Sequence, residues 1–318
     1  MNHILLGSSG IQVSPVALGC LNFGSRTNKQ VSYQLLDQFC SAGGNFLDTA
    51  NNYAFWNEGC VGGESETLLG QWMQERSNRS QVILATKAGA KPTYPGGGFE
   101  NKEGLSREAL EHALDESLKR LKTDYIDMYY THIDDKDVSL DETLETLDGF
   151  VKSGKVKAIG CSNYQKPRLH EALTISRYNT WTAFSCIQQR YTYLQPDPKV
   201  DFGVQVVADD ELLDYCYDHN MTVLAYSPLL GGAYTRADQL PQAYKNSYTN
   251  EKKQVLQDIA AEAGASINQI VLAWMQQKPR RVIPLIAASS SDQLAENLAS
   301  QDILLTSEQI ERLNRAAL

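Results

Sequence analysis

The sequence predicts an α/β protein, a (β/α)8 TIM barrel preceded by an N-terminal β-hairpin. Eight short apolar segments alternate with longer segments of helical periodicity along the 318 residues. Eight strand-helix units in about 300 residues match the count and size of such a barrel. A doubly wound sheet is disfavoured because no GxGxxG follows the first predicted strand. We therefore expect residues 1–318 to form a single barrel domain.

The expected elements follow a hairpin at residues 4–14. Strands are predicted at 16–19, 45–48, 82–87, 125–132, 156–160, 184–188, 222–227 and 282–286. Helices are predicted at 32–43, 106–121, 139–154, 209–220, 290–300 and 306–318. The segment SREALEHALDESLKRL illustrates the pattern, because its leucines and alanines recur at helical spacing behind Ser106, a favoured N-cap residue.

Composition and charge limit the class of partner. The formal net charge of −9 is spread along the chain, which argues against a nucleic-acid or anionic membrane surface and favours a small-molecule partner. The first ten residues do not resemble a signal peptide, and no later stretch offers a membrane span, so we expect a cytoplasmic protein. The six cysteines show neither CxxC nor His at metal-ligand spacing, so we expect neither disulfide nor metal.

Polar side chains gather at the predicted strand ends. In a parallel barrel the carboxyl ends of the strands, and the loops after them, open onto one face, where chemistry is expected. The residues that fall there are Asp48, Tyr53, Lys87, His132, Ser162, Asn163, Gln188 and Tyr226.

Four of these residues suit proton transfer to a carbonyl oxygen. A phenol is a poor acid at neutral pH unless a nearby cation stabilises the phenolate, and Lys87 would supply that cation to Tyr53. A buried lysine needs a carboxylate to stay charged, and Asp48 fits that role. His132 would hydrogen-bond the substrate oxygen and orient it. Taken singly, Asp48 is more typical of a turn or helix cap and Tyr53 of a loop anchor, while His132 suits a core residue and a functional one equally. Together, at the strand ends, they predict a catalytic site.

Several segments resemble one family across nearly the whole chain. The opening LLGSSGIQVSPVALGCLNFG, then NFLDTANNY, ATK, LKRLKTDYIDMYYTHID and GKVKAIGCSNY, are similar in order and spacing to aldo-keto reductase motifs. The resemblance implies an NADPH-dependent carbonyl reductase that converts an aldehyde or ketone to an alcohol by direct hydride transfer. It implies Tyr53 as general acid, Lys87 and Asp48 as its tuning pair, and His132 as the group that positions the carbonyl.

The resemblance also implies a set of cofactor-binding residues. Ser162, Asn163 and Gln188 would bind the nicotinamide carboxamide, and Tyr226 would stack on the ring. The pyrophosphate would lie under a loop containing Ser227 and Leu229. The adenosine segment would be Ser289, Gln293, Glu296 and Asn297.

The adenosine segment departs from the family pattern. Many relatives carry a Lys or Arg beside the 2'-phosphate of NADP, whereas residues 287–293 include neither. Without a cation a phosphate dianion binds less tightly, so NADP is expected but NAD stays open. Arg280 and Arg281 lie upstream of this segment. Arg236 or Lys245, from the loop after the seventh predicted strand, is another candidate to contact the 2'-phosphate.

The substrate and the oligomeric state stay open. Loops at 54–64, 87–104 and 188–205 would set substrate range, and Phe55, Trp56 and Tyr94 would form an aromatic wall or else pin these loops to the barrel. A second hypothesis is a cofactor-binding redox sensor or regulatory subunit with little turnover. A third, an isomerase or aldolase, would need a sugar-phosphate pocket that the sequence does not show.

Overall fold

Eight parallel strands close into a barrel in the computed structural model, which describes residues 1–280 and 282–316. Strand β10 pairs with both β9 and β3, so the sheet closes on itself among the described residues. The predicted fold is confirmed. The barrel strands are β3 (Ala17–Gly19), β4 (Phe46–Asp48), β5 (Ile83–Ala88), β6 (Ile126–Thr131), β7 (Val156–Ser162), β8 (Cys186–Arg190), β9 (Thr222–Tyr226) and β10 (Val282–Ile286).

The N-terminal hairpin lies against the start of the barrel strands. It consists of β1 (Ile4–Leu5) and β2 (Gln12–Val13), which pair antiparallel. The Gly7 amide donates to Thr222 Oγ1 at 2.8 Å, at the first residue of β9. Gly7 has a φ of +52°, and a Cβ there would lie 1.9 Å from the carbonyl oxygen of Ser185. The hairpin therefore packs on the amino-terminal end of the barrel and leaves the carboxyl end to the loops.

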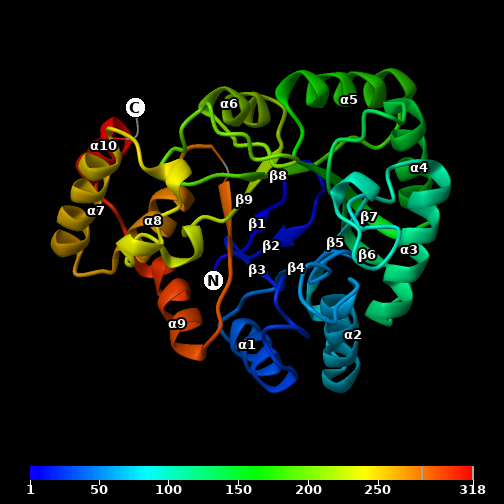
Figure 1. Ribbon diagram of the computed structural model, residues 1–318, viewed down its shortest axis with the longest axis horizontal. Coiled ribbons are helices and arrows are strands. Elements are labelled where there is room, and N and C mark those ends of the chain that lie inside the picture. The colour runs from blue at the N-terminus through cyan, green and yellow to red at the C-terminus, as the bar shows by residue number, and fades with distance from the viewer. Residues whose placement is uncertain (281, 317–318) are drawn as a thin grey trace.

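Helices surround the barrel (Figure 1). Most follow one strand and precede the next, whereas α7 and α8 both lie between β9 and β10, and α10 packs against α7. The helices are α1 (Lys29–Ser41), α2 (Glu64–Arg76), α3 (Arg107–Leu121), α4 (Leu140–Lys152), α5 (Lys166–Asn179), α6 (Asp210–Asp218), α7 (Thr249–Ala263), α8 (Ile267–Gln276), α9 (Ser291–Ala299) and α10 (Ser307–Ala316). None of the described helices is long and apolar enough to span a lipid bilayer.

Helix α3 shows how the sequence specifies these elements. Ser106 Oγ accepts a hydrogen bond from the Ala109 amide at 3.3 Å, which confirms the predicted cap. Leu110, Leu114 and Leu121 recur on one face and are buried against the barrel. The neighbouring α2 approaches so closely at Gly70 that a Cβ there would lie 2.2 Å from the Arg120 carbonyl oxygen.

Several strands differ in length from the prediction, which changes whether some site residues lie within a strand or after it. Strand β5 runs one residue beyond Lys87, and β7 includes Ser162. Strand β8 continues to Arg190, two residues beyond Gln188. Strand β6 stops at Thr131, so His132 lies just after it. The predicted last helix ends within the described residues at Ala316, and residues 317–318 lie outside them.

Candidate active site

Three adjacent strands bring the four predicted catalytic residues together. Asp48 ends β4, Lys87 lies near the end of β5, and His132 follows β6 directly. Strand β5 pairs with both β4 and β6 in parallel register, so the three residues reach the same end of the barrel. Tyr53 lies in the turn after β4, and its side chain reaches back over Asp48.

The Lys87 ammonium joins these groups into one hydrogen-bond network. Its Nζ donates to Asp48 Oδ1 at 2.6 Å and to the Thr49 carbonyl oxygen at 2.7 Å, and it lies 2.8 Å from Tyr53 Oη. The Tyr53 hydroxyl donates to Asp48 Oδ1 at 3.2 Å. Lys87 and Asp48 are both fully buried. Three partners match the three N–H donors of an ammonium, so the buried cation is fully satisfied.

The electrostatics keep the proton on the Tyr53 phenol. Burial, followed by the charge of Asp48, raises the pKa of Tyr53 well above its ordinary value. Burial lowers the pKa of Lys87, and the Asp48 carboxylate opposes that change. The predicted contacts among the three side chains are present, but the net pKa change at Tyr53 is upward. The phenol is therefore protonated at neutral pH, and the Lys87 ammonium lies beside its oxygen.

His132 lies beside Tyr53 as a neutral imidazole. The two ring centroids are 5.9 Å apart and meet edge to face. Burial and the charge of Lys87 lower the pKa of His132 well below its usual value. Its Nδ1 is buried and has no hydrogen-bond partner among the described residues. A neutral imidazole retains one N–H, so His132 is able to donate a hydrogen bond to an oxygen near Tyr53.

Asn163 is the centre of a second network beside the tetrad. Its Nδ2 donates to the His132 carbonyl oxygen at 3.0 Å, and its Oδ1 accepts from Tyr226 Oη at 2.8 Å. Its backbone has a φ of +62°, and its amide donates to Gln189 Oε1 at 2.5 Å. The amide side chain predicted to bind a carboxamide is thus already hydrogen-bonded within the protein, and it ties β6 to β9.

Gln188 connects this network to the tetrad. Its Nε2 donates to Asp48 Oδ2 at 2.8 Å, a contact across the barrel that the sequence did not predict. The Gln188 carbonyl oxygen accepts from Ser162 Oγ at 2.8 Å. The Asp48 carboxylate therefore has a partner on each oxygen, which fixes the orientation of its plane beneath Tyr53.

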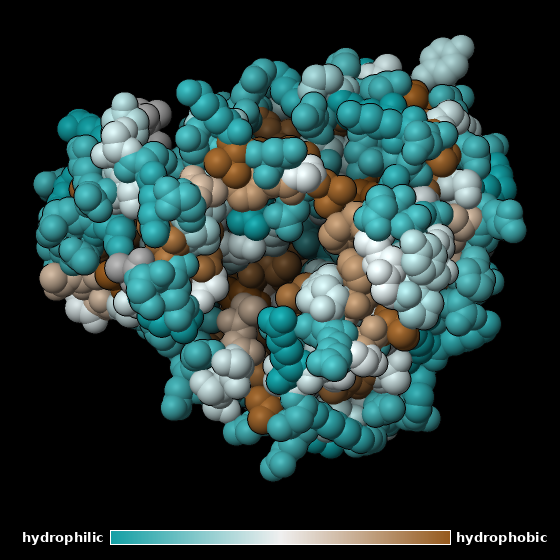
Figure 2. Space-filling model, viewed as in Figure 1, coloured by the Kyte–Doolittle hydropathy of each residue, from teal (hydrophilic) through white to brown (hydrophobic). Residues whose placement is uncertain are grey.

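A cavity of about 1040 Å³ opens over these networks. Figure 2 shows the molecule hollowed near the middle of the visible face, with hydrophobic residues inside a hydrophilic rim. Asp48 and Lys87 do not line the cavity and lie beneath Tyr53. All the other predicted site residues line it: Tyr53, His132, Ser162, Asn163, Gln188, Tyr226, Ser227, Leu229, Ser289, Gln293, Glu296 and Asn297.

Comparison with known proteins identifies the family. The aldo/keto reductase family model matches residues 15–317. The chain belongs to the aldo-keto reductase family. It is similar to norsolorinic acid reductase stcV of Emericella nidulans, at 30% identity over 97% of this chain and 79% of that protein. It is similar to aryl-alcohol dehydrogenase GME11368 of Pestalotiopsis microspora, at 27% identity over 99% and 81%.

A solved structure supports the same assignment. The thermostable aldo-keto reductase Tm1743, in complex with the inhibitor epalrestat, matches with a TM-score of 0.78 and 29% identity, over 99% of this chain and 100% of that one. The protein is accordingly an NAD(P)H-dependent oxidoreductase that acts on small-molecule carbonyl compounds.

Polar groups line the end of the cavity of this aldo-keto reductase that lies beside α9. The N-terminal turn of α9 supplies a polar wall, where Gln293 Oε1 accepts from both the amide and the hydroxyl of Ser289 at 2.9 Å. Asn297 Nδ2 donates to the Ala287 carbonyl oxygen at 3.2 Å. Asn268 also lines the cavity, and its Oδ1 is buried without a hydrogen-bond partner among the described residues. A buried acceptor without a donor is costly, so a ligand that donates there would be stabilising.

The basic residues considered for the phosphate lie in different places. Arg236 lines the cavity, with its Nη2 donating to the Gly231 carbonyl oxygen at 2.6 Å. Lys245 is not among the residues that line it. Arg280 points elsewhere, because it pairs with Asp210 at 2.7 Å and Asp214 at 2.6 Å on α6. Arg281 lies outside the described residues.

The three loop aromatics divide between the two alternatives that the sequence left open. Trp56 and Phe99 line the cavity, whereas Phe55 and Tyr94 do not. Phe55 packs edge to face on both Trp56 and Phe99, at 5.0 and 5.4 Å between centroids. Tyr94 accepts a hydrogen bond from Asn101 Nδ2 at 2.8 Å within its own loop. Phe55 and Tyr94 therefore hold loops in place, which was the second alternative, and Trp56 forms a wall. Phe99, which the sequence did not indicate, also lines the cavity.

Three further residues that the sequence did not indicate line the cavity or hold its wall. Asn268 and Gln205 line the cavity, and Gln189 holds the Asn163 backbone. Asn268 lies in the first turn of α8, next to Gln269 and just ahead of the apolar run IVLAWM, and this pair of amides before an apolar run was the available signal. Gln205 lies in a long loop, where no periodicity marks its direction.

Proposed function

We propose that this aldo-keto reductase converts an aldehyde or ketone to an alcohol, with Tyr53 as the general acid. The observation that carries this proposal is the Tyr53 phenol, which lines the cavity while contacting both Lys87 and Asp48 below it. The reduced nicotinamide, when bound, supplies the hydride. The protein's own residues have to orient the carbonyl and deliver a proton to its oxygen.

The proton step uses the tetrad. Tyr53 and His132 both line the cavity. A substrate oxygen that accepts the His132 N–H, and that takes the Tyr53 O–H over from Asp48 Oδ1, is held and polarised. As negative charge grows on that oxygen, Tyr53 transfers its proton, and the Lys87 ammonium stabilises the phenolate. Asp48 keeps Lys87 charged in a buried site, because the carboxylate opposes the effect of burial on the lysine.

We assign the cofactor residues by the same reasoning. Ser162, Asn163 and Gln188 would lie at the nicotinamide carboxamide, and Tyr226 would stack on the ring. Ser227 and Leu229 would lie at the pyrophosphate, with Ser289, Gln293, Glu296 and Asn297 at the adenosine. The position of all ten in the cavity wall supports this assignment.

NADPH is the proposed cofactor, with NADH as the alternative. Among the described residues that line the cavity, Arg236 is the cation available to a 2'-phosphate, and Arg280 is engaged by α6. An exposed arginine forms a bidentate pair with a phosphate, which favours NADPH. Glu296 and Gln293 on the same wall carry no positive charge, which is the reason NADH stays open.

Aromatic carbonyl compounds are the proposed substrates. Trp56 and Phe99 form an aromatic wall near Tyr53, with a distance of 6.4 Å between the Tyr53 and Trp56 centroids. Such walls favour flat apolar groups. The similarity to an aryl-alcohol dehydrogenase supports the same class. We also propose a single-domain protein of the cytoplasm, because the strands form one closed barrel and the six cysteines are free thiols, as a reducing compartment would keep them.

The test follows the loss of reduced-nicotinamide absorbance with NADPH and NADH in parallel, against aromatic and aliphatic aldehydes and ketones. We expect Tyr53→Phe to lower kcat by about 10²- to 10⁴-fold and to leave cofactor affinity nearly unchanged. The matched control is Tyr178→Phe, because Tyr178 is 88% exposed on α5. Full activity in Tyr53→Phe would overturn the acid assignment, and tight cofactor binding without turnover of any carbonyl would favour the redox-sensor alternative.

A further inference from the structure

A second, smaller cavity lies beside the proposed substrate site and shares a wall with it. It has a volume of about 520 Å³ and is formed by the loop after β3 and the loop after β4. Trp56 lines both cavities, and its side chain is 42% exposed between them. A molecule that lies along the indole ring therefore reaches from Tyr53 into the second cavity.

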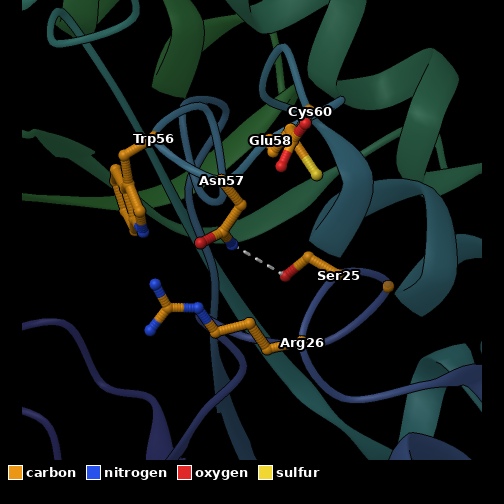
Figure 3. A pocket seen from close by; sticks show the side chains of 7 residues that line it. Ser25, Arg26, Trp56, Asn57, Glu58 and Cys60 are labelled. Carbon is orange, nitrogen blue, oxygen red and sulfur yellow. Dashed lines mark hydrogen bonds between the residues drawn. The ribbon is translucent and has the colours of Figure 1, made fainter.

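The second cavity presents a cation without a counter-ion. Figure 3 shows the Arg26 guanidinium extending into the space below Trp56 and Asn57. Within the described part of the chain, Arg26 forms no ion pair or hydrogen bond. The indole N–H of Trp56 likewise has no hydrogen-bond partner among the residues that the structure describes. Both donors are thus available to a ligand.

Asn57 makes the floor of this cavity polar and fixed. Its Nδ2 donates to Ser25 Oγ at 3.4 Å, which joins the two loops (Figure 3). Its Oδ1 is buried and has no partner within residues 1–280 and 282–316. This oxygen is an acceptor, so it does not itself bind an anion; Asn57 contributes a fixed connection between the two loops, and Arg26 and the Trp56 indole N–H are the donors.

We propose that this second cavity binds an anionic group, such as a carboxylate, at the far end of a carbonyl substrate. The proposal rests on the proposed reductase function and narrows its substrate class to aryl carbonyl compounds with an acidic tail. An unpaired guanidinium recognises a carboxylate through two parallel N–H donors. Because the chain carries a net charge of −9, its long-range field does not attract anions, so recognition has to come from the local contact.

Glu58 gives the proposal a built-in counter-test. It lines the same cavity, and in Figure 3 its carboxylate lies on the side of Asn57 away from Arg26. It forms no ion pair with Arg26 among the described residues. An acid in this position repels an anionic tail, so removal of its charge should act in the opposite direction to removal of the Arg26 charge.

The experiment compares 4-(carboxymethoxy)benzaldehyde with its neutral carboxamide. In Arg26→Gln we expect kcat/KM for the carboxylate to fall about fivefold, mainly through KM, and to stay unchanged for the carboxamide. In Glu58→Gln we expect it to rise about twofold. The control is Arg177→Gln, which removes the same charge from exposed helix α5. The Arg26 effect should shrink at high salt.

Three outcomes would overturn the proposal. Equal losses with the carboxylate and the carboxamide in Arg26→Gln would show a structural effect, and equal losses in Arg26→Gln and Arg177→Gln would show a general charge effect. Turnover of the carboxamide by the native enzyme tests the reductase function separately. If neither aldehyde is reduced, tryptophan fluorescence titration with 4-(carboxymethoxy)benzyl alcohol still decides, because unchanged affinity in Arg26→Gln would refute the subsite.

Discussion

Removal of the Lys87 charge alone should damage catalysis more than removal of both charges of the Lys87–Asp48 pair. Lys87 Nζ lies 2.8 Å from Tyr53 Oη, and Asp48 Oδ1 lies 3.2 Å from it. At an effective dielectric constant of about 20, the cation stabilises a phenolate by about 6 kcal/mol and the anion opposes it by about 5 kcal/mol. The two charges nearly cancel at the phenol, so burial is left as the largest cause of its raised pKa.

The single and double variants separate these effects. In Lys87→Met the carboxylate acts alone on Tyr53, and we expect kcat to fall by about 10³- to 10⁴-fold. In Lys87→Met/Asp48→Asn neither charge is present, and we expect kcat at least about tenfold above that of the single variant. Stability should follow the same order, because loss of one partner of a buried pair costs about 3–5 kcal/mol.

The assay is single-turnover oxidation of bound reduced nicotinamide by an aromatic aldehyde, with chemical denaturation on the same preparations. Cofactor affinity, measured by fluorescence titration, serves as the control, since neither Lys87 nor Asp48 lines the cavity. If the double variant were no faster and no more stable than Lys87→Met, the charge-balance reasoning would be wrong, and Lys87 would act by shape alone.

Two further predictions concern pH and packing. The pKa of His132 is lowered in the folded protein. Below about pH 6.5 the unfolded chain therefore binds one more proton than the native protein. As the pH falls below that value, the free energy of unfolding should decrease by up to about 1.4 kcal/mol per pH unit. His132→Gln should flatten that slope in urea denaturation between pH 5 and 7.5, and an unchanged slope would assign it to other groups. Gly70→Ala should destabilise the protein by more than about 2 kcal/mol, because a Cβ would lie 2.2 Å from the Arg120 carbonyl oxygen. Gly149→Ala should instead stabilise it by about 0.5–1 kcal/mol, because Gly149 has open space around it in α4. Thermal melts that show equal effects at the two glycines would contradict the close approach of α2 to α3.

The fold was predictable because short apolar strands and longer periodic helices alternate without interruption. That alternation also fixed which residues reach the carboxyl face, because parallel strands in register align their ends. The contact between Lys87 and Asp48 followed from two facts of the sequence: a lysine ends an apolar strand, and an acid ends the strand before it. A buried cation requires such a partner, so the chemistry constrained the geometry.

The loops were less predictable because no period sets the direction of their side chains. Tyr94 and Trp56 are both aromatic and both lie in long loops after strands, yet Tyr94 is hydrogen-bonded to Asn101 and Trp56 lines the cavity. The same limit applies to Asn163. Its backbone is left-handed, and its side chain contacts His132 and Tyr226. No pattern in the neighbouring sequence predicts this backbone conformation.

Tertiary contacts determine which arginine is available at the proposed cofactor end of the cavity, and sequence position alone does not. Arg280 is close in sequence to the adenosine segment, but two carboxylates of α6, Asp210 and Asp214, hold it. Arg236 is far away in sequence, and the loop after β9 brings it to the cavity wall. Its guanidinium already donates to the Gly231 carbonyl oxygen, so binding a phosphate requires it to share or exchange that bond. A cation that has to change partners discriminates less between phosphorylated and unphosphorylated cofactors than a free one, so the proposed preference for NADPH over NADH should be small when kcat/KM is measured with both.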